Sequence, residues 1–262
     1  VEAIAAAKWE LAESLPPASL LVLNGDDERL RRLAKHYRGE TLWFGRRGEC
    51  DVSAEGVHYQ NGHLSFRVES QRFWLPVWGR HHLASALAAI AVGTAYGLTY
   101  SEIADALAQY QPVRGRCSVV QADGVTVIDD TYNASPSGML AALELLREST
   151  CDGRKILVCG DMGELGESSQ DLHARLGEWI ADRSPKLLFA CGEFAANVSA
   201  GSIAAGMNPE RVVVRREPLQ LLDPLQQELR PGDMVLVKGC RAMGLERIVE
   251  QIAAPQRMRV AV

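Results

Sequence analysis

The stretch VTVIDDTYNASPSGMLAALELL, residues 125–146, predicts a strand, a polar turn and a helix, in that order. The apolar residues from 125 to 128 indicate a buried strand, which ends in two adjacent carboxylates, Asp129 and Asp130. Proline suits the first position of a helix, so we expect the helix to begin near Pro136. A strand, a short turn and a helix together form the basic unit of an α/β fold.

The turn between this strand and helix carries more polar side chains than a connection needs. Asp130, Thr131 or Ser135 can cap the helix, which would account for one of them. Capping leaves Tyr132 and Asn133 unexplained. An aspartate in this position can hold a ribose hydroxyl or a metal-bound water, and an asparagine can bind an amide or a carboxylate.

Strand and helix patterns alternate through the chain from residue 117 onward. We expect strands near 117–121, 124–129, 155–159, 187–191, 211–214 and 233–237, and helices near 136–147, 168–182, 194–205, 217–229 and 244–252. This alternation predicts a Rossmann-like, mostly parallel, doubly wound sheet with helices on both faces. Ligands of such sheets bind beyond the carboxyl ends of the strands, where Asp130 and its neighbours lie.

The chain before residue 117 has a different pattern of predicted helices and strands. We expect helices over 1–15, 26–37, 81–96 and 101–110, and strands over 19–24 and 41–45. Apolar and polar residues alternate over 51–77 around Asn61-Gly62, which predicts a β-hairpin. These elements indicate part of an α/β sheet with a small antiparallel addition. The segment QPVRGR, 111–116, is a plausible linker, so we expect two domains, 1–112 and 113–262.

The composition of the 262 residues excludes several classes of protein. A formal net charge of -5 argues against a general nucleic-acid binder. No apolar segment is long enough for a membrane span, and no signal peptide is visible. The six cysteines form no C-x-x-C pair, which favours a reduced compartment over a disulfide framework. We therefore expect a cytoplasmic protein, and we expect it to be a monomer.

Two later strand ends also carry unusual polar groups. The glycines of VCGDMGELGESSQDLH, 158–173, lack the G-x-G-x-x-G spacing, and Asp161 and Glu164 would repel a pyrophosphate. This segment is either a glycine-rich connection capped by Ser168 or Ser169, or a site for an ammonium group.

The second of these strand ends is MVLVKGCRAMGLERI, 234–248, which places Lys238 and Arg241 at a helix start. Cations beside free backbone N–H groups suit a carboxylate or a phosphate, although they can also be solvated loop residues. Cys240 has no arranged His–Asp partner, so we do not interpret it as a nucleophile. No H-E-x-x-H motif or Cys/His cluster occurs, and we expect no protein-held metal site.

Five segments together resemble the Mur ligase family of peptidoglycan synthesis: GRHHLASALAAIA (79–91), VRGR (113–116), IDDTYNASPSGMLAAL (128–143), VCGDMGELGE (158–167) and LVKGCRAMGLERIV (236–249). The resemblance covers essentially the whole chain. It implies that ATP and Mg²⁺ convert the carboxylate of UDP-N-acetylmuramoyl-tripeptide to an acyl phosphate, which the amine of D-Ala-D-Ala attacks. A sibling ligase with another amino-acid acceptor and a non-catalytic nucleotide-binding module are the alternatives.

The resemblance also implies domain and residue roles. Residues 1–112 would be the latter part of the central ATPase domain and 113–262 the C-terminal domain. Arg116 would be catalytic, reaching the ATP phosphates when the domains close. The other implied positions are His81, His82, Ser85 and Asp130 for the nucleotide, and Tyr132, Asn133, Asp161, Lys238 and Arg241 for the substrate.

The sequence departs from the family pattern at several of these positions. His82 and Ser85 stand where the family has asparagines near adenine, Ser135 replaces an asparagine, and Cys240 replaces a serine. We therefore expect a retuned nucleotide pocket. The larger departure is that no G-x-x-x-x-G-K-[ST] phosphate loop occurs in these residues, and the chain opens on Val1 rather than Met. We expect a portion of a longer ligase that is inactive alone.

Overall fold

The structure is a computed structural model, and it describes residues 2–47 and 49–254. The chain forms two compact units, the first ending at Gln111 and the second beginning at Pro112. Val1, at which the first predicted helix begins, and residues 255–262 of the predicted second domain lie outside the described residues.

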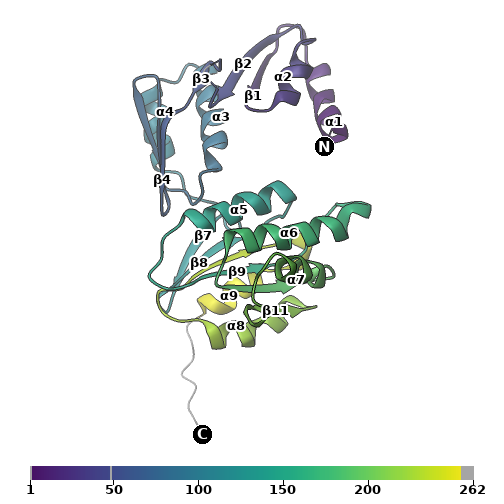
Figure 1. Cartoon of the computed structure of the whole chain (residues 1–262). Coiled ribbons are helices and arrows are strands. Elements are labelled where there is room, and N and C mark those ends of the chain that lie inside the picture. Colours follow the sequence, from purple (N-terminus) through teal and green to yellow (C-terminus); the bar gives the residue numbers. More distant parts are fainter. Residues whose placement is uncertain (1, 48, 255–262) are drawn as a thin grey trace. The chain divides into compact units, whose positions relative to one another are not determined.

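The first unit contains a parallel sheet and two early helices (Figure 1). Its strands, in spatial order, are β1 (Leu20–Asn24), β2 (Glu40–Gly45) and β3 (Val52–Ser53), and its early helices are α1 (Glu2–Glu13) and α2 (Glu28–Ala34). Trp9 and Leu23 are buried together between helix and sheet. The helix predicted over 26–37 is shorter than expected, because Asp27 caps it and the backbone turns after Lys35.

The rest of the first unit is an antiparallel meander with two helices. Its elements are β4 (Glu55–Gln60), β5 (His63–Val68), β6 (Gln71–Leu75), α3 (His82–Ala95) and α4 (Tyr100–Ala108). The predicted hairpin is confirmed, with Asn61 at φ 32° and Gly62 at φ 81° joining β4 to β5. Positive φ at both turn residues matches the twist of a hairpin, and Asn-Gly adopts it at low cost.

The second unit is built on one six-stranded sheet. Its strands are β7 (Ser118–Ala122), β8 (Val125–Asp130), β9 (Lys155–Cys159), β10 (Leu187–Cys191), β11 (Val212–Arg215) and β12 (Met234–Lys238). The spatial order is β11-β10-β9-β12-β8-β7, and only β7 runs antiparallel to its neighbour. The predicted α/β class with a mostly parallel sheet is therefore confirmed.

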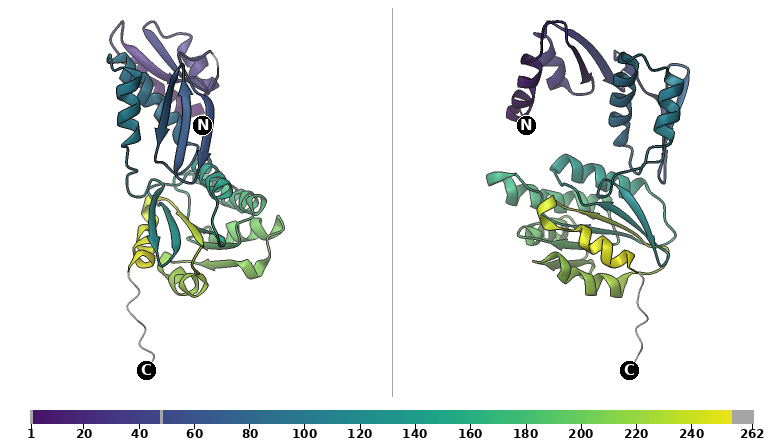
Figure 2. Two further views of the ribbon diagram at one scale, coloured as in Figure 1. Left: turned by 90° about the vertical axis from the view of Figure 1, so that its left-hand side faces the viewer. Right: turned by 180° about the vertical axis from the view of Figure 1, so that it is seen from behind.

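The helices of the second unit cover both faces of this sheet (Figure 2). One layer contains α5 (Pro136–Glu148), α6 (Ser169–Arg183) and α7 (Ala195–Ala204), and the other contains α8 (Leu222–Glu228) and α9 (Glu246–Ala253). From β9 to β11 the chain steps in one direction across the sheet, and from β11 to β12 it steps back. Right-handed crossovers in opposite directions place their helices on opposite faces, which produces the two layers.

The core of the second unit follows the two-residue period of its strands. Val127, Val158 and Val235 are fully buried toward α8 and α9. The intervening residues Ile128 and Leu236 are also fully buried, because the sheet is covered on both faces. Each such side chain contributes about 1.5–3 kcal/mol by leaving water. This core holds the strand ends in fixed positions.

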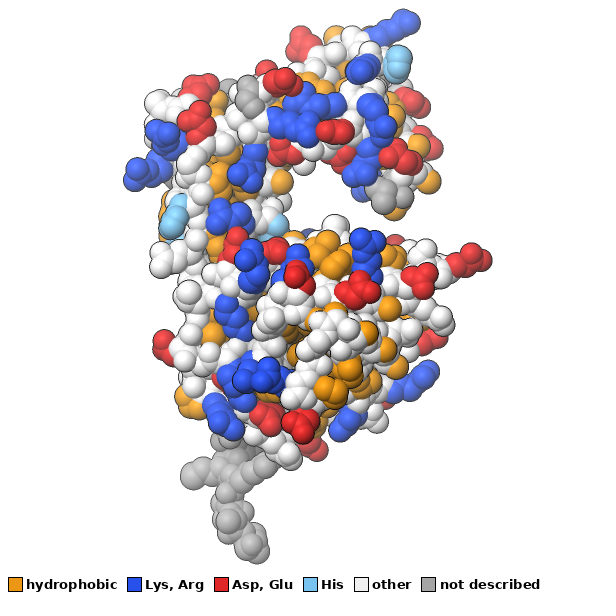
Figure 3. All heavy atoms as spheres, in the orientation of Figure 1, with side chains coloured by type: hydrophobic (Ala, Val, Ile, Leu, Met, Phe, Trp, Pro, Cys, Tyr) orange, Lys and Arg blue, Asp and Glu red, His pale blue; other side chains and the backbone are white. Residues whose placement is uncertain are grey.

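The surface of the second unit carries mixed charge. On the face drawn in Figure 3, Lys and Arg side chains lie among Asp and Glu side chains. Within residues 2–47 and 49–254, no helix is both long and apolar enough to cross a membrane.

Candidate functional site

The chemistry-bearing loops of the second unit meet at the carboxyl ends of β8, β12 and β9. β12 lies between the other two strands, and Lys238 pairs in register with Asp130 on one side and Cys159 on the other. The chain leaves β8 and β9 toward one face of the sheet and β12 toward the other. Such a switch point opens the crevice in which doubly wound proteins bind ligands.

Hydrogen bonds join the three loops at this edge. The Nζ of Lys238 donates to Oδ2 of Asp130 at 2.6 Å and to the carbonyl oxygen of Asn133 at 2.8 Å. On the other side, Gly160 N–H donates to the Lys238 carbonyl and Cys240 N–H to the Asp161 carbonyl, both at 2.9 Å. The Lys238 and Asp130 side chains are only 6% and 15% exposed, so this ion pair is largely shielded from solvent.

The two adjacent aspartates that end β8 have different hydrogen-bond partners. The carboxylate of Asp129 is buried and accepts from Gly115 N–H at 3.1 Å, and from the N–H and hydroxyl of Thr131 at 3.3 and 2.6 Å. Asp129 therefore ties the 113–116 turn to the 131–135 turn. Asp130 faces Lys238 instead.

The entry to α5 is capped by one of the three predicted residues. Ser135 Oγ accepts from Gly138 N–H at 3.2 Å, and Pro136 occupies the first turn as expected. Asn133 Oδ1 accepts from Ala134 N–H at 2.8 Å, and Asn133 is an exposed residue.

Two arginines lie against one tyrosine beside this turn. The guanidinium carbon of Arg116 is 4.0 Å from the centre of the Tyr132 ring, and that of Arg241 is 5.9 Å from it. Tyr132 is 45% exposed, and both arginines are exposed. The structure thus brings six predicted site residues together in the second unit: Arg116, Asp130, Tyr132, Asn133, Lys238 and Arg241.

Asp161, in the loop after β9, has its hydrogen-bond partners in the loop after β10. Its carboxylate accepts from the N–H groups of Glu193 and Phe194 at 2.7 and 3.1 Å, where α7 begins. Ser168 occupies the N-cap position of α6, one of the two predicted positions, but it forms no side-chain cap hydrogen bond. Neither hydroxyl accepts from the helix, because a 3-10 turn, η1 (Gly166–Ser168), runs directly into α6.

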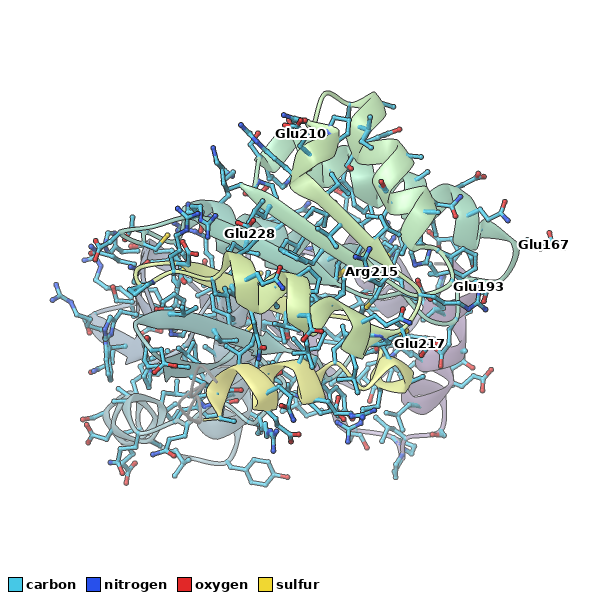
Figure 4. The ribbon with its side chains drawn as sticks, turned by 90° about the horizontal axis from the view of Figure 1, so that it is seen from below. Glu167, Glu193, Glu210, Arg215, Glu217 and Glu228 are labelled. Carbon is cyan, nitrogen blue, oxygen red and sulfur yellow. The ribbon has the colours of Figure 1, made fainter. Side chains whose placement is uncertain are left out.

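Further charged side chains border the same edge, as Figure 4 shows from below. Glu193 and Glu217 each lie two residues after the last residue of β10 and β11, whereas Glu210 and Glu228 lie toward the opposite ends of the strands. The sequence interpretation did not single out Glu193 or Glu217. Their position shortly after a predicted strand was the signal that could have identified them.

The histidines predicted to lie near the nucleotide belong to the first unit. His81 and His82 open α3 with their ring centres 4.4 Å apart, and Ser85 is exposed on the same helix. All the other predicted site residues lie in the second unit.

The cysteines are all free thiols. Burial raises the pKa of the Cys191 thiol to about 12, with the charges of Asp161 and Glu217 adding to the shift. Burial likewise raises the pKa of Cys159. Protonated, buried thiols are poor nucleophiles, and both behave as small apolar side chains.

His173 supports the loop after β9 from inside the protein. It is fully buried, Nε2 accepts from Met162 N–H at 2.9 Å and Nδ1 lies 2.6 Å from the Ser169 carbonyl. An imidazole that accepts at Nε2 carries its proton at Nδ1, so Nδ1 donates to Ser169. Its ring also stacks on Phe194 at 4.7 Å.

We expect His173→Leu to lower the free energy of unfolding by about 2–3 kcal/mol, because the buried Met162 N–H loses its acceptor. Urea unfolding followed by circular dichroism measures this difference. His58→Leu is the control, since His58 is exposed on β4 and the change should cost less than about 0.5 kcal/mol. Equal stability of the two variants would contradict this role.

Two family models match the chain. The Mur ligase middle domain matches residues 1–93, and the Mur ligase, glutamate ligase domain matches residues 115–241. Among curated proteins, the UDP-N-acetylmuramoyl-tripeptide–D-alanyl-D-alanine ligase of Bacillus subtilis (strain 168) is 30% identical over 254 residues, covering 96% of this chain and 55% of the relative. The ligase of the same name from Mycobacterium leprae is 32% identical over 290 residues, covering 98% and 56%.

Solved structures show the same similarity. A crystal structure of MurF from Acinetobacter baumannii has a TM-score of 0.82 at 25% identity and covers 95% of this chain and 55% of its own. The MurF ligase of Thermotoga maritima in complex with ADP has a TM-score of 0.81 at 27% identity, covering 96% and 57%. The chain thus spans about half the length of the relatives it matches.

Proposed function

The chain belongs to the Mur ligase family, and from this we propose that it forms part of an ATP-dependent ligase that joins D-Ala-D-Ala to UDP-N-acetylmuramoyl-tripeptide. The names of the curated relatives support the reaction, and the ADP complex of the T. maritima relative supports nucleotide use. In this proposal residues 1–112 belong to the ATPase domain and residues 113–262 form the C-terminal domain.

One observation carries the proposal. The ion pair between Lys238 and Asp130 joins the D-D-T-Y-N-A and K-G-C-R segments at the switch point of the sheet. These two segments are far apart in sequence, and both were singled out for chemistry. Their meeting at the carboxyl edge places cations, a carboxylate and an exposed amide where an α/β fold binds its ligands.

The proposed reaction has two steps. The tripeptide carboxylate attacks the γ-phosphorus of ATP, and ADP leaves. The amine of D-Ala-D-Ala then attacks the acyl carbon, the tetrahedral intermediate collapses, and inorganic phosphate leaves. Both steps develop negative charge on oxygen, which guanidinium groups stabilise, and we assign this role to Arg116. We assign Asp130 to the ribose, and Asn133, Lys238 and Arg241 to the acceptor side.

The described residues of the second unit provide groups suited to ATP but, at the end of β8, no available ligand for Mg²⁺. The guanidinium group of Arg116 is suited to the phosphate oxygens of ATP. The carboxylates at the end of β8 are already committed, Asp129 to Gly115 and Thr131 and Asp130 to Lys238. We therefore assign no residue of the second unit as a Mg²⁺ ligand and route no step through the ion.

The test is an activity assay of the full-length protein that contains these residues. Incubation with ATP, Mg²⁺, UDP-N-acetylmuramoyl-tripeptide and D-Ala-D-Ala should release phosphate and yield the UDP-pentapeptide by mass spectrometry. Residues 1–262 alone should release none, since they contain no phosphate loop and phosphoryl transfer depends on positioning. Turnover by this chain alone would contradict its proposed place in the enzyme.

A competition assay separates the remaining functions. Preference for single amino acids over D-Ala-D-Ala would indicate a sibling ligase, and nucleotide binding without product would indicate a non-catalytic module. We further propose a cytoplasmic monomer. The six free thiols fit a reduced compartment, and light scattering of the full-length protein measures the oligomeric state.

A further inference from the structure

Tyr132 is the only aromatic residue in the polar turn after β8, and two cations share its ring. We propose that Tyr132 is a positioning residue, which holds the guanidinium groups of Arg116 and Arg241 together as one anion-binding pair. This inference rests on the proposed ligase function. It adds a role for Tyr132 that acts through the arginines rather than through direct contact with the acceptor.

The backbone beneath Tyr132 is fixed on both sides. Tyr132 N–H donates to the Gly115 carbonyl at 3.0 Å, and Gly115 N–H donates to the buried carboxylate of Asp129 at 3.1 Å. Gly115 has φ 79°, and a Cβ there would lie 3.3 Å from Tyr132 N, so glycine permits this close approach. The segment that carries Arg116 is thereby docked on the turn that carries the ring.

The ring contacts leave the guanidinium N–H groups of both arginines available to a ligand. Within the described residues, the guanidinium groups of Arg116 and Arg241 form no hydrogen bond or ion pair, and each contacts the Tyr132 ring. Nearby Arg114 differs, because it pairs with Glu250. The distance between the two guanidinium carbons cannot exceed the sum of their distances to the centre of the Tyr132 ring. Two neighbouring cations with free N–H groups suit a phosphate or a carboxylate.

The ring lowers the cost of ordering these side chains. An arginine has many rotamers, and a face-on contact with an aromatic ring restricts them by an attraction that a leucine cannot supply. Loss of the ring should therefore weaken transition-state binding rather than the fold, since Tyr132 is half exposed. We expect about a tenfold loss of kcat/KM for ATP in Tyr132→Leu.

Kinetics of the full-length protein test this role. Tyr132→Phe, which keeps the ring and removes the hydroxyl, should restore kcat/KM to within about twofold of wild type. Tyr96→Leu is the matched control, because Tyr96 is 85% exposed in the first unit. In the double variant Arg116→Ala, Arg241→Ala, the addition of Tyr132→Leu should cause no further loss of kcat/KM for ATP. A tenfold loss in that background, or a gain of activity in Tyr132→Leu, would overturn the proposal.

A spectroscopic measurement on residues 1–262 is independent of activity. Ring currents from Tyr132 should shift the arginine Hε resonances of Arg116 and Arg241 upfield, and Tyr132→Leu should remove the shift while Tyr132→Phe retains it. Unshifted resonances in the wild type would refute the positioning role even if the enzyme is active. An inactive full-length protein with shifted resonances would instead refute the ligase function alone.

Discussion

Arg116→Ala should lower kcat of the full-length protein about a thousandfold, with little change in the melting temperature. Removing an arginine that stabilises phosphoryl-transfer charge costs about 10³–10⁵ in rate in other enzymes, and we take the low end because Arg241 lies on the same ring. Steady-state release of phosphate under saturating substrates measures kcat. Arg116 is exposed, so its loss leaves the core unchanged.

Arg114→Ala provides the matched control. Arg114 lies in the same turn, two residues earlier, but its exposed guanidinium pairs with Glu250. Surface ion pairs contribute about 0–1 kcal/mol, so stability should change little and kcat by less than about twofold. Similar losses of kcat in both variants would show that the turn, rather than the Arg116 guanidinium, supports the reaction.

Asp233→Ala should lower the free energy of unfolding of the second unit by about 3–5 kcal/mol, because two backbone N–H groups lose their acceptor and the largely buried Arg154 keeps only Glu228 as an ion-pair partner. The Asp233 side chain is 2% exposed and that of Arg154 is 21% exposed. Asp233 accepts from the Arg154 side chain at 2.8 Å, and from the N–H groups of Arg154 and Arg230 at 2.8 and 3.0 Å. This network binds the starts of β9 and β12 together.

The pH dependence of the same network has a definite sign. Burial alone would raise the pKa of Asp233, but the hydrogen bonds from Arg154 and Arg230 outweigh it and hold this pKa below its usual value. A carboxylate with a lowered folded-state pKa stabilises the fold above its unfolded-state pKa, and the contribution disappears as the pH falls through the folded value. The stability difference between wild type and Asp233→Asn should therefore shrink below about pH 4.

Urea denaturation between pH 3 and 7 measures both effects. Asp182→Ala is the control, since Asp182 is 76% exposed and pairs with Arg183 at the surface. It should cost less than about 1 kcal/mol. A stability difference for Asp233→Asn that grows on acidification would contradict the assignment.

Local sequence patterns predicted the elements of the second unit well. The strands are short apolar runs bounded by turn residues. Helix α5 begins at Pro136, as predicted, because proline is suited to the first turn of a helix. The helix predicted over 217–229 is instead a 3-10 turn, η3 (Pro218–Leu221), followed by α8. Pro224 lacks an N–H and is accommodated in the first turn of the new helix.

The division of roles within the site could not be predicted from the sequence. Asp129 and Asp130 are adjacent and chemically identical, and their partners Gly115 and Lys238 come from distant parts of the chain. Asp161 likewise meets the start of α7 only in three dimensions. Strand order decides these contacts, and the pattern of apolar residues that identifies a strand contains no information about its neighbours.

The central place of β12 has a consequence for biosynthesis. β8 and β9 each lack one neighbour until residues 234–238 have been translated, because β12 fills the gap between them. The second unit therefore completes its sheet only after the other five strands have been synthesised, and until then it presents unpaired strand edges. A ribosome stalled before Met234 would display a nascent chain with two open edges, which is a substrate for chaperones rather than a folded intermediate.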